Sequence, residues 1–230
     1  MLCRLHDRLC HAIFLLFHEY LDGVRFSQKG IHSLTVGVGL SNAGITVKVS
    51  FPDVNCSSAN CSSVLVQQNL DGSKFFNRSW AEFKVGFGIP SGNYWLGNDE
   101  LSQLTLTGRY KVRFNLQQAD TGSWYYVDYN TFRVQSEADN YKMYVSGYSG
   151  NAAESFRYHN HNVMMFSTYD RDNDRSSSNC AASRGGGFWH KRCDHVQINL
   201  PRVGGSDSFS WNNLSGGEEL QTSRMWLHCK

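Results

Sequence analysis

The chain has 230 residues, a net charge of +2 and 18% charged residues. This length suits one well-packed domain, since domains typically span about 100 to 200 residues. Because no run of like charge occurs, the sequence argues against electrostatic binding to nucleic acid or to a membrane surface. An aromatic content of 13% with 21 glycines favours a loop-rich, partly β fold, and no apolar run approaches the ~20 residues of a membrane span.

The first twenty residues carry Arg4 and Arg8 ahead of a short apolar run at residues 12–17. A signal peptide needs an apolar stretch of about 7 to 15 residues and a small-residue cleavage site, and neither is clear here. The segment is therefore either an atypical leader or the start of a truncated chain. We expect residues 1–22 to be a leader or a poorly matched N-terminal segment and residues 23–230 to form one domain.

Seven cysteines are more than a cytosolic domain of this size ordinarily has, which predicts an oxidising compartment. Four N-glycosylation sequons agree with secretion; they lie at Asn55, Asn60, Asn77 and Asn213. Zinc is the competing reading, but Cys56 and Cys61 stand too far apart for a tight zinc knuckle and no second pair follows. An odd cysteine count leaves one thiol over, and Cys229 near the end of the sequence is placed to cross-link chains into an oligomer.

Residues 24–55 read as short β-like runs around Gly and Asn turns. Ser79-Trp-Ala-Glu82 is a capping box, which predicts a short helix with Trp80, Phe83 and Phe87 on one face. Asn98 or Asp99 is expected to cap a second short helix.

From residue 110 the period changes from helical to alternating. Apolar residues at 110, 112, 114 and 116 alternate with polar ones, and the pattern recurs less strictly over residues 125–134 and 141–145. The turns between these runs predict an antiparallel meander with one covered face.

In the C-terminal third periodicity disappears, and Asp170, Asp172 and Asp174 stand at alternate positions in a loop. These carboxylates repel one another unless a cation lies among them, and calcium takes six to eight oxygen ligands, so calcium is the natural candidate. An EF-hand is excluded, because its sixth and twelfth positions, Gly and Glu, would be Arg175 and Ala181. Two interpretations remain open: a calcium site in the loop, completed by backbone carbonyls of the Ser run, or a solvated acidic turn without a cation.

The residues around this loop form a recognisable block. Met165 to Asp174, Asn179-Cys-Ala181, Gly186-Gly-Phe-Trp189 and Cys193 closely resemble the calcium-binding segment of the fibrinogen C-terminal domain family, which includes ficolins, tachylectins, angiopoietins and tenascins. Further matching motifs stand in the same order, so the resemblance covers residues 64–228; they are Asp71-Gly-Ser, Ser79-Trp80, Tyr94-Trp-Leu-Gly-Asn-Asp99, Glu137-Ala-Asp139 with Tyr141, Ser146-Gly-Tyr-Ser-Gly-Asn-Ala152, Tyr158-His-Asn160, Trp211 and Ser223-Arg-Met225.

The resemblance implies an α+β fold with a central antiparallel β-sheet, short helices and a loop-rich, calcium-binding C-terminal subdomain. It implies a disulfide between Cys180 and Cys193. It also implies that Asp172 and Asp174, with Ser176 and Ser178, hold Ca²⁺. Calcium and the bridge would tie down a region too poor in regular structure to order itself.

In lectin-like members of that family, a cup beside the calcium loop receives an acetyl group. Here Arg184 stands where acetyl-binding members have Tyr, and Asp194 stands where they have His. The resemblance also implies a cis peptide bond between Arg192 and Cys193. An acetyl methyl needs an aromatic wall, and an ionised carboxylate cannot donate to its carbonyl. We therefore expect Arg184, Arg192, Cys193 and Asp194 to bind a more polar or charged ligand.

Catalysis is not expected. The sequence has no Gly-x-Ser-x-Gly elbow, Walker loop or His-Glu-x-x-His motif, and residues 146–150 miss the first by one place. Histidines at 159 and 161 are expected to be structural, and His190 and His195 to lie at the rim of the pocket.

Taken together, the sequence predicts a secreted, calcium-binding, fibrinogen-like recognition protein that binds carbohydrate or acetylated ligands in innate defence. The alternative is an extracellular matrix or receptor-binding protein for adhesion or signalling, which uses the same loops on a protein partner. Arg184 and Asp194 favour this alternative.

Overall fold

The structure is a computed structural model that describes residues 35–41, 44–50, 63–158, 162–193, 195–204, 208–214 and 218–230. The chain divides into two compact units, residues 1–52 and 53–230. In the first unit, β1 (Thr35–Ser41) pairs antiparallel with β2 (Gly44–Ser50), so the β-like reading of this stretch is confirmed over the two strands. The expected boundary after residue 22 lies outside the described residues.

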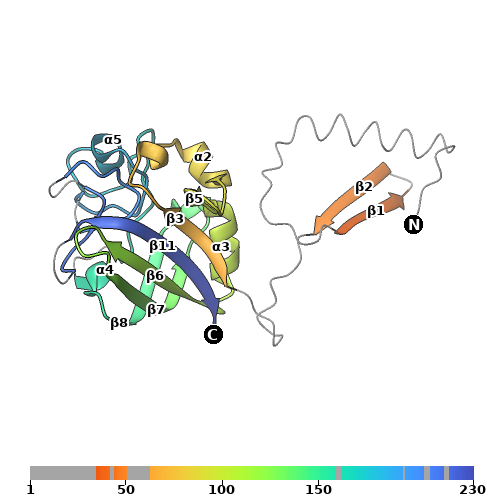
Figure 1. The fold of residues 1–230 in the computed structure, drawn as a ribbon. Helices are drawn as coiled ribbons and strands as arrows, with labels where there is room; N and C mark the ends of the chain where they lie inside the picture. Colours follow the sequence, from red (N-terminus) through yellow and green to blue (C-terminus); the bar gives the residue numbers. More distant parts are fainter. Residues whose placement is uncertain are drawn as a thin grey trace. The chain divides into compact units, whose positions relative to one another are not determined.

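The second unit is built on a seven-stranded antiparallel sheet in the order β4-β5-β3-β11-β6-β7-β8 (Figure 1). The last strand of the chain lies in the middle of this sheet, between β3 and β6. The strands are β3 (Val64–Asn69), β4 (Phe87–Gly88), β5 (Tyr94–Trp95), β6 (Tyr110–Gln118), β7 (Trp124–Val134), β8 (Met143–Gly150) and β11 (Leu220–Cys229).

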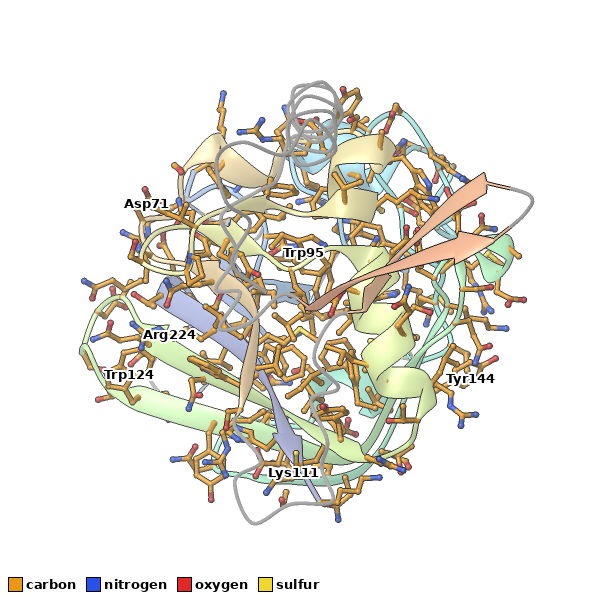
Figure 2. All side chains as sticks on the ribbon, turned by 90° about the vertical axis from the view of Figure 1, so that its right-hand side faces the viewer. Asp71, Trp95, Lys111, Trp124, Tyr144 and Arg224 are labelled. Carbon is orange, nitrogen blue, oxygen red and sulfur yellow. A yellow bond between two sulfur atoms is a disulfide. The ribbon has the colours of Figure 1, made fainter. Side chains whose placement is uncertain are left out.

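The predicted meander is confirmed as β6, β7 and β8, which pair in sequence order. Val112, Phe114 and Leu116 on β6 are fully buried, because alternate residues of a strand point to the same face of the sheet. The opposite face meets solvent: Trp124 on β7 is 46% exposed, whereas Trp95 is fully buried inside the domain (Figure 2). The sheet therefore has one core face and one open face.

Helix α2 (Trp80–Val85) starts at the predicted capping box. The Ser79 Oγ accepts from the Glu82 amide, and the Ser79 amide donates to Glu82 Oε2 at 2.9 Å. Trp80 and Phe83 are buried, and the backbone leaves the helix at Gly86 with φ 85°. Only glycine adopts that conformation without strain, so the helix ends there.

Helix α3 (Asn98–Leu106) forms where the second helix was expected, but its cap differs. The N-cap residue is Gly97, so the expectation of a cap by Asn98 or Asp99 is wrong. The side chain of Asn98 is fully buried and accepts from the Trp95 indole at 3.1 Å, and the Asp99 carboxylate accepts from a tyrosine hydroxyl. Both side chains are thus committed to these contacts and do not cap the helix.

The C-terminal part of the unit is mostly loops around short elements. Aromatic packing holds these loops against the domain: the Phe166 ring centroid lies 5.0 Å from Phe83 and 5.1 Å from Trp189, and the Trp189 indole donates to the Tyr141 carbonyl at 2.7 Å. No helix in the described part of the protein is long and apolar enough to cross a membrane. The remaining short elements of the unit are η1 (Lys74–Phe76), η2 (Glu137–Asp139), α4 (Ser155–Tyr158), α5 (Cys180–Arg184), β9 (Val196–Gln197) and β10 (Ser210–Trp211).

Candidate functional site

The acidic loop folds as a tight turn centred on the Asp174 carboxylate. Its Oδ1 accepts from the Ser176 amide at 2.7 Å, and its Oδ2 accepts from the Cys180 amide at 2.8 Å. The Asp174 amide in turn donates to Asp172 Oδ1 at 3.2 Å. Burial raises the pKa of Asp174, the two amides oppose that rise, and the nearby Asp172 carboxylate adds to it. The two carboxylates therefore lie close enough to repel each other.

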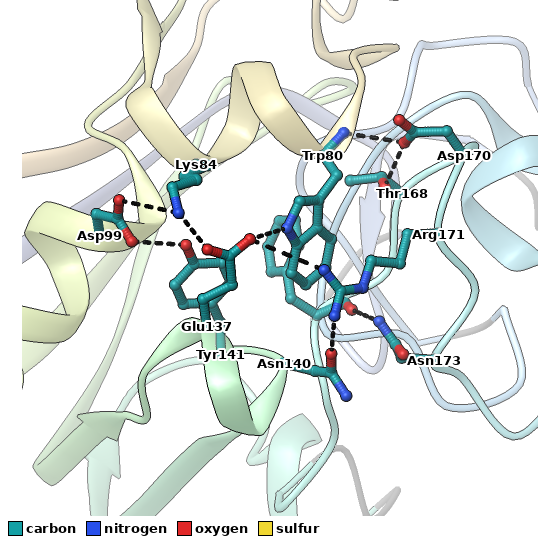
Figure 3. Close-up of polar contacts among 11 residues, drawn as sticks. Trp80, Lys84, Asp99, Glu137, Asn140, Tyr141, Thr168, Asp170, Arg171 and Asn173 are labelled. Atoms are coloured by element: carbon teal, nitrogen blue, oxygen red, sulfur yellow. Dashed lines mark hydrogen bonds and ion pairs between the residues drawn. The ribbon is translucent and has the colours of Figure 1, made fainter.

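Asp170 belongs to a different part of the structure. Its Oδ1 accepts from the Trp80 amide at 2.9 Å and from the Thr168 hydroxyl at 2.7 Å (Figure 3). The Trp80 amide is the first of helix α2 and lacks a partner within the helix, so a carboxylate there is favourable. Asp170 thus binds the start of helix α2, whereas Asp172 and Asp174 contact each other within the turn.

The donor set of this turn fits a hard cation such as calcium. Asp172 is exposed and Asp174 half-buried, so the pair is reachable from solvent. Ser176 is half-buried and accepts from the Ser178 amide at 3.4 Å, which keeps the serine run in the turn. The described residues contain no cluster of three or more His, Cys, Asp or Glu side chains that could hold a metal. The remaining ligands would therefore have to be backbone carbonyls and water.

The disulfide that the resemblance implies is present. Cys180 and Cys193 are bonded with their Cα atoms 4.9 Å apart, and the bridge closes a separation of 13 residues. Cys180 is the first residue of α5, and Asn179 caps that helix through its side-chain oxygen, which accepts from the Ala182 amide at 2.9 Å. The bridge thus joins the end of the acidic loop to the segment that the resemblance assigns to the pocket.

The four expected ligand-binding positions do not all take the predicted form. Arg184 is half-buried at the end of α5, Arg192 is exposed, Cys193 is buried, and Asp194 lies outside the described residues. The expected cis bond between Arg192 and Cys193 is wrong: the bond is trans, and Cys193 has a φ of 67°.

His190 was expected at the rim of the pocket, but it is a core residue with 1% exposure. Its Nε2 pairs with the Gly186 carbonyl at 2.8 Å. Burial lowers the pKa of His190 to about 4, helped by the charge of Arg184. His195 is half-buried and pairs with the Asn212 side chain, while His159 and His161 lie outside the described residues.

A polar network beside the loop was not identified from the sequence as functional. Glu137 Oε1 accepts from the Trp80 indole at 2.7 Å, and Glu137 Oε2 accepts from the Lys84 ammonium (Figure 3). The hydrogen bond from Lys84, followed by that from Trp80, lowers the pKa of Glu137. The only signal was the match of the segment from Glu137 to Tyr141 to the family motif, since nothing local shows that this carboxylate meets helix α2.

Two further predictions concern single residues. Cys229 is already disulfide-bonded, so the expectation that it supplies a free thiol to cross-link chains is wrong. Asn77 and Asn213 are both exposed, which glycosylation requires, and modification there stays a prediction. The sequons at Asn55 and Asn60 lie outside the described residues.

Comparison with known proteins gives the same assignment along most of the sequence. The family model described as "Fibrinogen beta and gamma chains, C-terminal globular domain" matches residues 39–226. Fibrinogen-like protein A of Apostichopus parvimensis is 38% identical over 158 residues, which is 66% of this chain and 55% of that protein. Tenascin of Mus musculus is 40% identical over 168 residues, which is 71% of this chain but 8% of that protein.

Comparison with solved structures gives the same family as comparison of sequences. The fibrinogen-like globe domain of human ANGPTL6 superposes with a TM-score of 0.67 at 28% identity, over 87% of this chain and 91% of that one. The protein spans less than two thirds of the length of the curated relatives that it matches. With a family model matched over most of its length and the antiparallel fold seen in that globe, the chain belongs to the fibrinogen C-terminal globular domain family.

Proposed function

We propose that this protein is an extracellular, calcium-binding recognition module without catalytic activity. The observation that carries the proposal is the turn in which the Asp174 amide donates to Asp172 Oδ1 at 3.2 Å, closed by the disulfide from Cys180 to Cys193. Disulfides persist in oxidising compartments, so the bridge supports secretion. The chain is similar to tenascin and to the fibrinogen alpha chain, and this similarity to extracellular proteins supports a role in recognition.

In this proposal calcium is held by the Asp172 and Asp174 carboxylates and by backbone carbonyls at Ser176 and Ser178, with water completing the coordination. The cation supplies the positive charge that two adjacent carboxylates require. Asp172 and Asp174 position it, while the amides of Ser176 and Cys180 orient the Asp174 carboxylate. The role of calcium is therefore to order the loop that presents the binding surface.

The ligand surface is proposed to lie at Arg184, Arg192, Cys193 and Asp194. Arg184 and Arg192 are cations in the described part of this surface, which suits a polar or anionic group on the ligand. One candidate ligand is a glycan or acetylated surface group, bound in innate defence. The second is a matrix or receptor protein, and it is favoured by these charges and by a relative, microfibril-associated glycoprotein 4 of Mus musculus, 38% identical over 145 residues.

Retention on an N-acetylated sugar resin in calcium separates these candidates. Elution by free acetate and, in a second run, by a chelator would support a calcium-dependent acetyl pocket. Failure to bind, with calcium still raising the thermal stability, would contradict the lectin assignment and support a protein partner. An unchanged melting temperature and no heat of calcium binding would contradict the calcium site itself.

A further inference from the structure

Glu137 lies at the centre of a polar network that joins helix α2 to the acidic loop (Figure 3). Its Oε1 accepts from the Trp80 indole at 2.7 Å and lies 3.8 Å from Arg171 Nη1. Its Oε2 accepts from Lys84, whose ammonium also lies 3.7 Å from Asp99 Oδ2. One carboxylate thus accepts hydrogen bonds from Trp80 and Lys84 and forms an ion pair with Arg171, which belongs to the acidic loop.

The side chains of Asp170, Arg171 and Asn173 bind residues outside the turn. Those of Asp172 and Asp174 bind backbone amides within the turn and at its end. The Arg171 guanidinium carbon lies 4.0 Å from the Trp80 ring centroid, and Arg171 Nη2 donates to the Asn140 side chain at 2.6 Å. Asn173 Nδ2 donates to the Phe166 carbonyl at 2.8 Å. Asp172 lies between these anchored residues, so their positions set where its carboxylate can point.

Trp80 contacts both Glu137 and the acidic loop. Its amide binds Asp170, its indole N–H binds Glu137, and its ring face carries Arg171. Only 8% of Trp80 is exposed, and its ring packs 5.3 Å from Tyr141 between centroids. The rigid part of the network is therefore the buried indole, and Glu137 links it to Arg171, since it accepts from the indole N–H and pairs with the guanidinium.

From this geometry we infer that Glu137 is a positioning residue for the calcium loop, an inference that rests on the calcium site proposed above. Glu137 is not a ligand. By its contacts with Arg171 and Trp80 it keeps residues 170–173 in the conformation in which Asp172 Oδ1 accepts from the Asp174 amide. Groups that orient metal ligands commonly change metal affinity by about 10- to 100-fold when they are removed. Loss of Glu137 is thus expected to weaken calcium binding without removing a ligand.

The test is calorimetric titration of calcium into the chelator-treated, full-length Glu137→Gln variant. We expect the dissociation constant to rise about 10-fold, the lower end of that range, because Glu137 acts through Arg171 and Trp80. Arg171→Lys keeps the charge but loses the planar stacking group, and we expect a smaller rise. This second variant keeps the inference testable if Glu137→Gln fails to fold.

Two control variants separate positioning from general stability. Glu100→Gln removes the same charge from an exposed residue in the first turn of α3 and should leave calcium affinity unchanged. Asp128→Asn breaks the bidentate ion pair with Arg113 in the sheet, with contacts of 2.7 and 2.6 Å. It should lower the melting temperature without changing calcium affinity. An equal loss of affinity in Asp128→Asn and Glu137→Gln would overturn the inference.

Hydrogen exchange of the calcium-free protein gives a readout that does not need calcium to bind. Amides at residues 171–176 should exchange faster in Glu137→Gln than in the parent protein and in Glu100→Gln. If the parent protein binds no calcium, the proposed calcium site fails, and this exchange difference alone decides whether Glu137 orders the loop. Unchanged exchange together with unchanged affinity in Glu137→Gln would overturn the inference.

Discussion

The sheet and the C-terminal loops of the second unit are held together in different ways. The sheet relies on repeated antiparallel pairing and on strands whose alternate residues are fully buried. The loops rely on a disulfide, aromatic contacts and single side-chain bonds such as that from Asn173 to the Phe166 carbonyl. A sheet spreads its stability over many equivalent contacts, whereas each loop contact has no substitute. The loops should therefore respond to single changes that leave the sheet intact.

Phe114→Ala should have the largest effect and should not distinguish the two regions. Phe114 is fully buried on β6, and its ring lies 5.3 Å from Phe156 and 5.5 Å from Trp211. Truncating a buried Phe to Ala typically costs about 3 to 5 kcal/mol. Denaturant unfolding should shift as one transition for sheet and loops. Selective loosening of the loops alone would contradict this.

Replacing both Cys180 and Cys193 by Ser should have the next largest effect, and it should be local. Loop-closure arguments give about 3 kcal/mol for a bridge of this separation. Proteolysis and hydrogen exchange should report opening of residues 162–193 and 195–204, while protection of β6 and β7 is kept. Equal loss of protection in β6 would show that the two regions unfold together.

Acidification should weaken the loop region through His190. The pKa of buried His190 falls from 6.5 to about 4, so the folded protein binds fewer protons than the unfolded state between these values. The stability that depends on neutral His190 is complete above pH 6.5 and is lost as pH falls toward 4, by up to about 1.4 kcal/mol per pH unit. His190→Gln should flatten this part of the stability profile. A profile with the same slope in the variant would assign the pH dependence to other groups.

Ser79→Ala should have the smallest effect, about 1 kcal/mol, because it removes one half of the capping box of α2. Thermal unfolding with and without calcium measures it. Thr107→Ala is the matched control, because it also removes one hydroxyl hydrogen bond at a helix end, the bond to the Leu104 carbonyl at the C-terminal end of α3. Since α2 carries Trp80, Ser79→Ala should lower loop protection more than the control does.

The candidate site was predictable from the sequence only in part. Ordered motifs located Asp172, Asp174 and the bridge from Cys180 to Cys193. The motifs did not show that Asp170 binds helix α2 and not the proposed cation, because its partner, the Trp80 amide, lies 90 residues away in the sequence.

The sequence by itself determined the local elements: the capping box starts α2, and the alternation of β6 marks which of its faces is buried. These signals are local, because periodicity and capping depend on residues a few places apart. Only the tertiary structure decided that the last strand lies between β3 and β6 and that Glu137 meets Trp80 and Arg171. These contacts join segments far apart in the sequence, and no short-range pattern encodes which distant partner a strand or a carboxylate will meet.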